Sequence, residues 1–397
     1  RVDGQRPPRI LRGDVFSRLP PELLAEIHGR LGLVDLFAFA AACGAWRARH
    51  LLTKLEAPCL VLPGSTVAVV TAKTCLFSLS DRRSDTPRYP PDPAMRAPVV
   101  VLGSSGGWLV TADAQGLLWM ANPVTGEQAD LPAITTIPLL RWSEPTHSFL
   151  VDVDGFLQMR YSGGGTPPLL MANRQAGATT TSSLSAEQLR NWFYRKVILS
   201  GSPRSGGSYS AMLILARQYG APAFATAEHP EWRLSPNRDA VEDAIFHRGR
   251  FYSITYSGML ESWDHQHGGG GLLTSTMEYR KYLAAAPDGR LVTELGQWEE
   301  VEAAAADMVI GKAALFVGMN SSACVATAEH PGLRPGCIYF TNDQLGLAYQ
   351  DWELLQLSVN TGHGPGQRDW DVGVFSLSDG TVERIQGLRA VHPFPSV

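Results

Sequence analysis

The chain has 397 residues, of which 44% are hydrophobic and 18% charged, and its formal net charge is −4. This length and composition predict one large domain with a smaller one, and they exclude a wholly disordered chain. The near balance of 34 basic and 38 acidic residues gives no electrostatic reason to expect a nucleic-acid or membrane partner.

The first predicted elements are helices. Pro20 and Pro21 suit a first helical turn, and the leucines and isoleucine that follow recur at three- and four-residue spacing up to Leu31. Gly32 ends this helix, and a second apolar helix is predicted from Asp35 to Ala42. A third helix would carry Cys43, Trp46 and Arg47. Three short helices make a marginal core, so such a unit usually leans on a partner or a neighbouring domain.

From about residue 60 onward the pattern changes to short strands separated by turns. Glycine and proline are frequent, with 39 and 27 residues in the whole chain. Long runs with helical periodicity are rare here, and Ala284–Ala286 and Ala303–Ala306 are short runs. The predicted strands are Val67–Val70, Val99–Leu102, Trp108–Thr111, Leu117–Met120, Phe149–Val153, Lys196–Leu199, Met212–Ala216, Ala244–Phe246, Phe251–Tyr256, Ala314–Val317, Cys337–Phe340 and Val372–Leu377. Many short strands between turn signals are typical of a sandwich or a propeller.

A degenerate module favours the propeller. It reads as a glycine-bounded strand, a turn and a second strand, and it recurs at Gly107–Gly126, Gly249–Asp264, Asp288–Val292 and Gly373–Gly380. A blade takes about 40–50 residues, so the remaining chain predicts about six or seven blades. The two ends of such a domain often share a blade, which predicts that strands near Cys59–Leu62 and Val372–Leu377 are neighbours. The segments Gly268–Gly271 and Ala176–Ser185 are predicted to be solvated loops or inter-strand insertions.

The N-terminal helices resemble an F-box. The family pattern is present as Leu19-Pro20, Glu22-Leu23-Leu24, Ile27, Arg30-Leu31, Asp35-Leu36, Cys43 and Trp46-Arg47. Two positions depart from the pattern, because Ala42 replaces a usual valine and Gly44 replaces a usual lysine or arginine. Both differences are expected to weaken packing against an adaptor without removing it.

The rest of the chain resembles plant F-box proteins with a Kelch-like β-propeller. The segments that carry this resemblance are Cys337–Asp343, Asp371–Leu377 and His392–Ser396. The resemblance implies an F-box domain over residues 14–56 and a substrate-recognition propeller over residues 57–397. It also implies a non-catalytic substrate receptor of a Skp–cullin–F-box ubiquitin ligase. The client protein stays unknown.

The implied adaptor contacts lie on the first helices. They are Leu19, Pro20, Leu23, Leu24, Ile27, Leu31, Leu36 and Trp46. Such apolar residues would dock as helix-in-groove anchors on a Skp-type adaptor, which links to a cullin. The alternative for these residues is simple core packing. The alternative for the whole chain is a propeller that binds and sequesters a partner without degrading it, with a vestigial F-box.

Other motifs favour no enzyme and no cofactor. Gly103, Ser105 and Gly107 fit the G-x-S-x-G spacing of hydrolases, but a strand is predicted after them where the nucleophile elbow needs a helix. Asp264, His265 and His267 could contact a metal, but no further ligand cluster accompanies them. We therefore expect no catalytic residue, cofactor or metal.

The cysteines and the hydropathy pattern bear on location. The five cysteines are odd in number and none forms a CxxC pair, which argues against a disulfide framework and a structural zinc site. No apolar run reaches 18 residues, so no transmembrane helix is expected. Free thiols suit a reducing compartment, and a cytoplasmic or nuclear location is predicted.

Overall fold

The computed structural model describes residues 19–42, 58–62, 75–79, 82–85, 100–153, 179–201, 209–235, 239–264, 267–272, 280–286, 291–296, 311–319, 321–330, 332–341, 373–383 and 385. Strands dominate these residues, which confirms the prediction of a mainly β chain. The helices are α2 (Pro21–Arg30), α3 (Leu33–Ala42) and α6 (Ala186–Gln188), which continues as a π-helical turn over Leu189–Phe193. Short 3-10 turns cover Ile134–Thr136, Arg217–Tyr219 and Thr327–Glu329.

The described strands form seven sheets. Four of these sheets are β1 (Cys59–Leu62), β2 (Cys75–Ser78) and β3 (Arg83–Asp85); β4 (Val100–Ser105), β5 (Trp108–Ala112), β6 (Leu118–Ala121) and β7 (Gln128–Asp130); β8 (Leu140–Ser143), β9 (Ser148–Val153) and β10 (Thr180–Leu184); and β11 (Tyr194–Leu199), β12 (Ser210–Leu215), β13 (Ala223–Thr226) and β14 (Arg233–Leu234). The other three are β15 (Val241–His247), β16 (Arg250–Thr255), β17 (Met259–Asp264) and β18 (His267–Leu272); β19 (Arg280–Ala285) and β20 (Leu291–Gly296); and β21 (Ala313–Val317), β22 (Ala323–Ala326), β23 (Cys337–Phe340), β24 (Gly373–Ser376) and β25 (Val382–Glu383).

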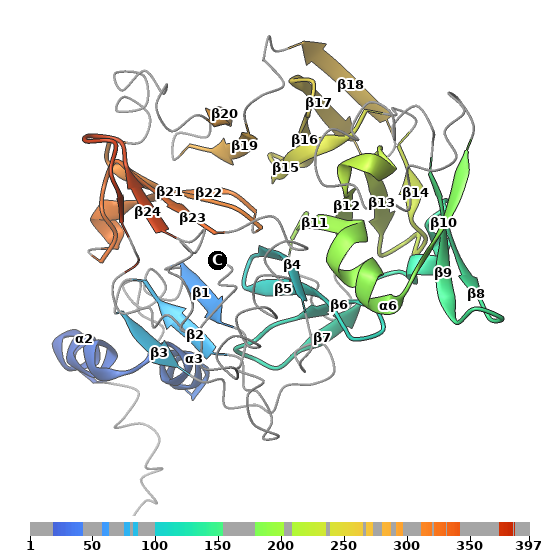
Figure 1. Ribbon diagram of the computed structural model, residues 1–397. Coiled ribbons are helices and arrows are strands. Elements are labelled where there is room, and N and C mark those ends of the chain that lie inside the picture. The colour runs from blue at the N-terminus through green and yellow to red at the C-terminus, as the bar shows by residue number, and fades with distance from the viewer. Residues whose placement is uncertain are drawn as a thin grey trace, which may run out of the picture.

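Strand pairing is antiparallel between chain neighbours in six of these sheets. The last sheet differs, because β21 runs parallel to β23 and pairs along its other edge with β22. Its order is therefore β22-β21-β23-β24-β25. β22 is thus an edge strand, and it lies on the side of the sheet that faces the centre (Figure 1).

The sheets follow one another around a common centre (Figure 1), and β4, β11, β15 and β19 are neighbours there. Buried apolar side chains fill the space between consecutive sheets. Leu109 packs with Val61 between the first two sheets, Val197 packs in one cluster with Leu102 of β4, and Leu283 packs with Ile245. Such wedge-filling clusters are what hold the blades of a propeller together.

The first and last sheets meet through side chains. Leu60 and Phe77 share a buried cluster with Phe316, Tyr339 and Val374. Within the described residues no strand pairing joins β1 to β24, so the expected shared blade is not seen, and the ends meet by packing instead. The number of blades stays a prediction.

The β8–β10 sheet lies at the edge of the molecule, away from the centre (Figure 1). Its buried residues Phe149 and Val151 join the same cluster as Leu102 and Val197. Because β4 and β11 are direct neighbours, the chain between them adds this sheet on the outside and returns to the centre.

The repeated glycine module corresponds to equivalent turns in two sheets. Gly116 precedes β6 and Gly258 precedes β17, with φ angles of 78° and 85°. Their N–H groups donate to the carbonyls of Asp113 and Thr255, respectively. Positive φ is easily adopted only by glycine, so the repeated spacing marks the same turn geometry in both sheets.

Two sequence predictions are wrong in local structure. The glycine-rich segment Gly268–Gly271 lies in β18 and not in a loop, because its backbone pairs along β17 and an edge strand needs no packed side chain on its outer side. Ala176–Ser185 contains β10, which pairs with β9. The short helical run noted at Ala284–Ala286 overlaps the end of β19, where strand pairing overrides the helical preference of alanine. The expected strand Val67–Val70, the run Ala303–Ala306 and the third helix lie outside the described residues.

One helical turn was not predicted. The side chains of Ser185 and Gln188 form a reciprocal capping box at the start of α6. The sequence signal was available, since serine followed three residues later by glutamine is the pattern of this cap.

A buried hydrogen bond between β11 and the turn before β6 predicts a modest stability change. The buried Tyr194 hydroxyl donates to the Gly116 carbonyl at 2.8 Å, and burial raises the pKa of this phenol well above its usual range. Tyr194→Phe leaves that carbonyl without its donor and is expected to lower the free energy of unfolding by about 1–2 kcal/mol in urea melts. Tyr209→Phe is the matched control, because its hydroxyl bonds the Asp130 carbonyl at a half-exposed site and should cost less. Equal losses in both variants would contradict the prediction.

Candidate functional site

Helices α2 and α3 form the first candidate site. Pro20 precedes α2 and Pro21 opens it, and the N–H of Leu24 donates to the Pro20 carbonyl at 3.1 Å. Proline suits this position because the first N–H groups of a helix have no partner within it. Leu31 is extended (φ −84°, ψ 139°) and ends the helix. Two residues later the chain enters helix α3 at Leu33.

The two helices pack through one face of α2. Leu24 and His28 are buried, and the His28 ring meets Phe39 of α3 edge-on, with 5.2 Å between centroids. Leu36 is also fully buried. Residues four apart lie on the same side of a helix, so Leu24 and His28 form the face that α2 turns inward.

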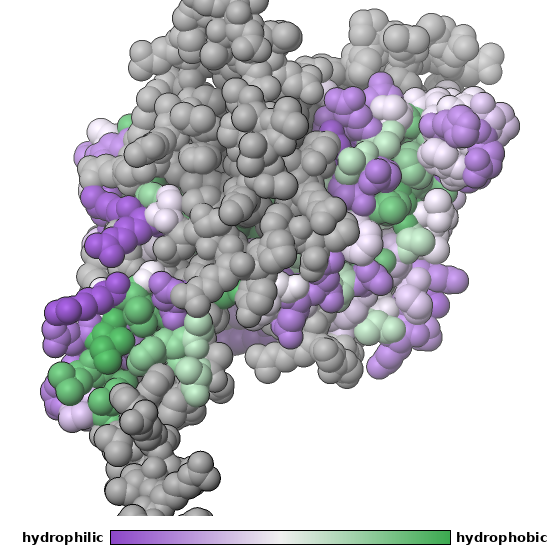
Figure 2. Space-filling view, turned by 90° about the horizontal axis from the view of Figure 1, so that it is seen from below, coloured by the Kyte–Doolittle hydropathy of each residue, from purple (hydrophilic) through white to green (hydrophobic). Residues whose placement is uncertain are grey.

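The adjacent face of α2 is left open. Leu23 is 48% exposed, while Ile27, Leu19 and Leu31 are half-buried and Pro20 is exposed. Figure 2 shows hydrophobic surface gathered over these helices. Exposed apolar surface of this kind marks an interaction site more often than isolated apolar residues do.

The predicted adaptor residues therefore divide into two groups. Leu24 and Leu36 are core residues in this structure, whereas Leu23 is the most accessible of the large apolar ones. Trp46 lies outside the described residues. Which of the eight contact an adaptor stays a prediction.

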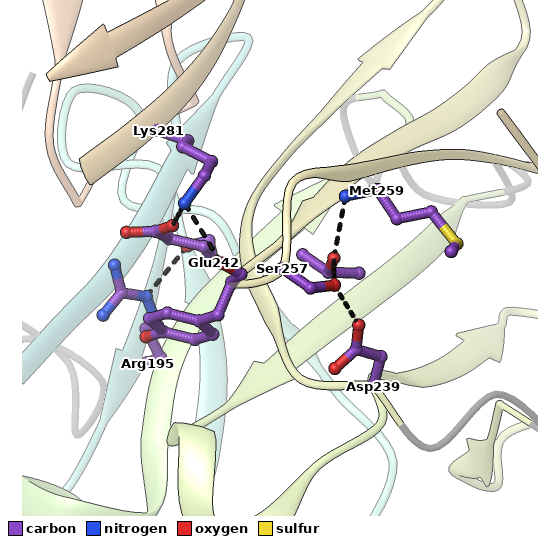
Figure 3. Close-up of polar contacts among 8 residues, drawn as sticks. Arg195, Asp239, Glu242, Ser257, Met259 and Lys281 are labelled. Carbon is purple, nitrogen blue, oxygen red and sulfur yellow. Dashed lines mark hydrogen bonds and ion pairs between the residues drawn. The ribbon is translucent and has the colours of Figure 1, made fainter. Parts of the chain in front are cut away.

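A second candidate site lies where the inner strands meet (Figure 3). Lys281 of β19 is buried and forms an ion pair with Glu242 of β15 at 3.1 Å between Nζ and Oε2. Its ammonium also donates to the Tyr256 carbonyl at 3.2 Å. Arg195 of β11 donates to the Glu242 carbonyl at 2.9 Å and lies over the Tyr256 ring. These contacts connect three sheets.

A second buried ion pair is formed by the residues that follow Arg195 and Glu242 in their strands. Lys196 of β11 and Asp243 of β15 are both buried and are joined at 2.5 Å. The other carboxylate oxygen of Asp243 accepts from the backbone N–H of Leu283 at 2.8 Å. A buried charge is tolerated when it is paired and hydrogen-bonded in this way.

Burial and the neighbouring charges shift the pKa values of the two basic groups on β11. Burial lowers the pKa of the Lys196 ammonium, and the Asp243 carboxylate offsets only part of that shift. Burial alone would lower the pKa of Arg195, but Tyr256, Glu242 and Asp243 are among the groups that together raise it. The arrangement ties the sheets together, and it supplies no nucleophile with an adjacent base.

A polar turn beside this cluster is structural as well. Ser257 donates to the Asp239 carboxylate, and its hydroxyl lies 2.8 Å from that of Thr255 (Figure 3). The Thr255 hydroxyl also accepts from the N–H of Met259 at 3.0 Å. These bonds hold the turn between β16 and β17.

The motif with hydrolase spacing is a strand, a turn and a strand. Ser105 ends β4, Gly107 lies in the turn, and β5 follows. The Ser105 hydroxyl lies 3.5 Å from the Leu199 carbonyl. A nucleophile elbow needs a helix after the turn, so this geometry differs from the hydrolase motif.

No metal centre is found in the part of the chain that the structure describes, since no three histidine, cysteine, aspartate or glutamate side chains come together there. Asp264 and His267 end one strand and start the next, and His265 lies outside the described residues. The described helices include none with the length and apolarity of a membrane span.

Sequence reasoning missed the central charged cluster. A signal was present, because Lys196, Glu242, Asp243 and Lys281 interrupt otherwise apolar strands. Charged residues in such runs are rarely buried unless they are paired. The sequence does not show which residues pair, because Lys196 and Asp243 are 47 residues apart and Lys281 and Glu242 are 39 residues apart.

None of the curated proteins matches the chain. Two similar solved structures are the extracellular domain assigned to the hybrid two-component system BT4673 of B. thetaiotaomicron and a second structure of it, described as a one-component system. Identity is 9% and 10%, the TM-scores are 0.23 and 0.21, and 59% and 56% of this chain are covered. The chain spans 31% of each of those two proteins.

The match to a family model is more extensive. The model of the KIB1-4 beta-propeller covers residues 76–376, which are most of the chain and include all seven described sheets in whole or in part. The mainly β composition and the sheets arranged around a centre agree with that family. The chain belongs to the KIB1-4 beta-propeller family.

Proposed function

We propose that the chain is the substrate receptor of a Skp–cullin–F-box ubiquitin ligase. Helix α2 and its neighbour bind a Skp-type adaptor, and the propeller binds the client protein. The observation that carries the proposal is the 48% exposure of Leu23, on a helix whose adjacent face is buried through Leu24. An amphipathic helix with an apolar residue left open fits a groove on a partner.

The chain contributes proximity and no bond chemistry. The propeller belongs to a family that suggests protein binding, and its rim loops offer the surface for a client. The adaptor and cullin would bring the ubiquitin-charged enzyme to the client's lysines. This function needs no catalytic residue, cofactor or metal in the chain, and it fits a cytoplasmic or nuclear location.

Titration of a purified Skp-type adaptor against the full chain tests the proposal. We expect a complex of equal stoichiometry at micromolar concentration or below, and co-purification of a cullin when the adaptor is present. If the adaptor does not bind at these concentrations, the ligase function is refuted. Capture of a partner without adaptor binding would favour the sequestering propeller instead.

A further inference from the structure

The loop between β21 and β22 carries an inference beyond the proposed function. Its described residues are Gly318, Met319, Ser321 and Ser322, which we call the central loop. It starts from the inner end of the last sheet. Each of its four residues contacts a part of the chain that belongs to another sheet.

Two contacts reach the second sheet and its neighbours. The N–H of Ser321 donates to the carbonyl of Ser104 in β4 at 3.3 Å. The Met319 side chain is buried in the cluster that contains Leu102 of β4 and Val197 of β11. The central loop therefore inserts an apolar side chain between two sheets that are distant from its own along the chain.

Two further contacts reach the buried ion pair. The Lys196 ammonium donates to the Gly318 carbonyl at 3.3 Å, and the Ser322 hydroxyl lies 3.5 Å from the Asp243 carboxylate. Asp243 also holds Lys196 and the backbone of Leu283. One carboxylate thus connects β11, β15, β19 and the central loop.

Contacts with β4, β11 and β15 require the central loop to cross the middle of the arrangement, where these strands are neighbours. We propose that the central loop is a plug, latched through Asp243 and Lys196, that closes the axis of the propeller and clamps the last sheet to the sheets opposite. A ligand then cannot pass along the axis at the level of Asp243. Partners meet the propeller on its faces and rim.

Hydrogen exchange of the full chain, read by mass spectrometry, tests this plug. Asp243→Asn breaks the latch, so amides in peptides covering residues 313–326 are expected to exchange at least about tenfold faster. Met319→Ala withdraws the apolar anchor and leaves the ion pair intact, and it is expected to speed exchange in the same peptides. Both effects arise because the loop would lose contacts with the opposite sheets.

Lys281→Met is the matched control. It removes an equally buried ion-pair partner, whose ammonium binds Glu242 and the Tyr256 carbonyl. Its faster exchange should be confined to β19 and β15. Equal acceleration of residues 313–326 in this control, or no acceleration in the Met319 variant, would overturn the proposal.

A cross-link gives a second measurement that does not depend on destabilising the chain. The backbones of Ser104 and Ser321 are within hydrogen-bond distance, so Ser104→Cys with Ser321→Cys should form a disulfide under mild oxidation, found by peptide mapping. Ser104→Cys with Ser257→Cys should not, because Ser257 lies in the turn after β16. Absence of the first cross-link in a folded variant would show that the loop does not cross the axis.

Discussion

Gly103→Ala is expected to be the most destabilising single-methyl addition in the second sheet, lowering the free energy of unfolding by about 3 kcal/mol or more. A Cβ at this position would stand 2.1 Å from the carbonyl oxygen of Val197 in β11, and the obstructing atom belongs to backbone. Overpacking usually costs about 1–3 kcal/mol, when side chains can shift. The β11 backbone cannot shift readily, because Lys196 is fixed by Asp243. Urea unfolding monitored by tryptophan fluorescence measures the loss.

The matched control for this variant is Gly201→Ala. Gly201 lies just after β11, and a Cβ there would have no atom within 4 Å. Its unfolding free energy should change by less than about 1 kcal/mol. If the two variants melt alike, the close approach of β4 and β11 is not required for stability.

The role of Gly103 shows where a sequence motif can mislead. In the sequence it is the first glycine of a hydrolase-like spacing. In the structure it allows two inner strands to approach at the centre. The glycine is needed for backbone contact with a strand about 90 residues later, and no local pattern encodes that distance.

The local strand and turn pattern was predictable. Gly116 and Gly258 stand before equivalent strands because the same turn requires positive φ in both sheets. Alternation of apolar residues in β9, with Phe149, Val151 and Val153 buried, likewise follows from strand geometry. Both signals depend on only a few consecutive residues, so they can be recognised in the sequence before the fold is known.

Pairing between distant strands was not predictable. His267 and the glycines after it form β18 because β17 offers a complete row of hydrogen-bond partners. Lys196 and Asp243 meet because the register of two separate sheets places them opposite each other. In both cases tertiary contacts decide the outcome and intrinsic preference does not.

The apolar pattern of helix α2 was predictable from the sequence, but the face that α2 turns toward α3 was not. Spacing alone made Leu23, Leu24 and Ile27 one apolar stripe. Packing of α2 against α3 divides that stripe, since Leu24 is 6% exposed and Leu23 48%. The position of the partner helix decides which leucine remains accessible, and sequence spacing does not contain it.

Leu23→Asp is expected to lower the affinity for a Skp-type adaptor at least about a hundredfold without unfolding the chain. Burying a leucine side chain contributes about 1.5–3 kcal/mol, and a carboxylate forced into the same apolar groove adds a desolvation cost. A hundredfold loss corresponds to about 2.7 kcal/mol. The fold should survive, because Leu23 is about half exposed in the free chain. Adaptor titration of both proteins gives the affinities, and a thermal melt of each gives the stability.

Ala25→Asp separates a lost contact from a general charge effect. Ala25 is exposed on the same helix, but it lies about 200° around the helix axis from Leu23. The same charge at this position should leave adaptor affinity within about twofold of the parent, since surface charges away from a contact act weakly. Equal losses of adaptor affinity in the two variants would mean that the added negative charge weakens binding, and not the loss of the apolar contact of Leu23. A lower melting temperature of Leu23→Asp with proportional loss of binding would place Leu23 in the core of the free chain, and the docking face would then have to be sought elsewhere on α2.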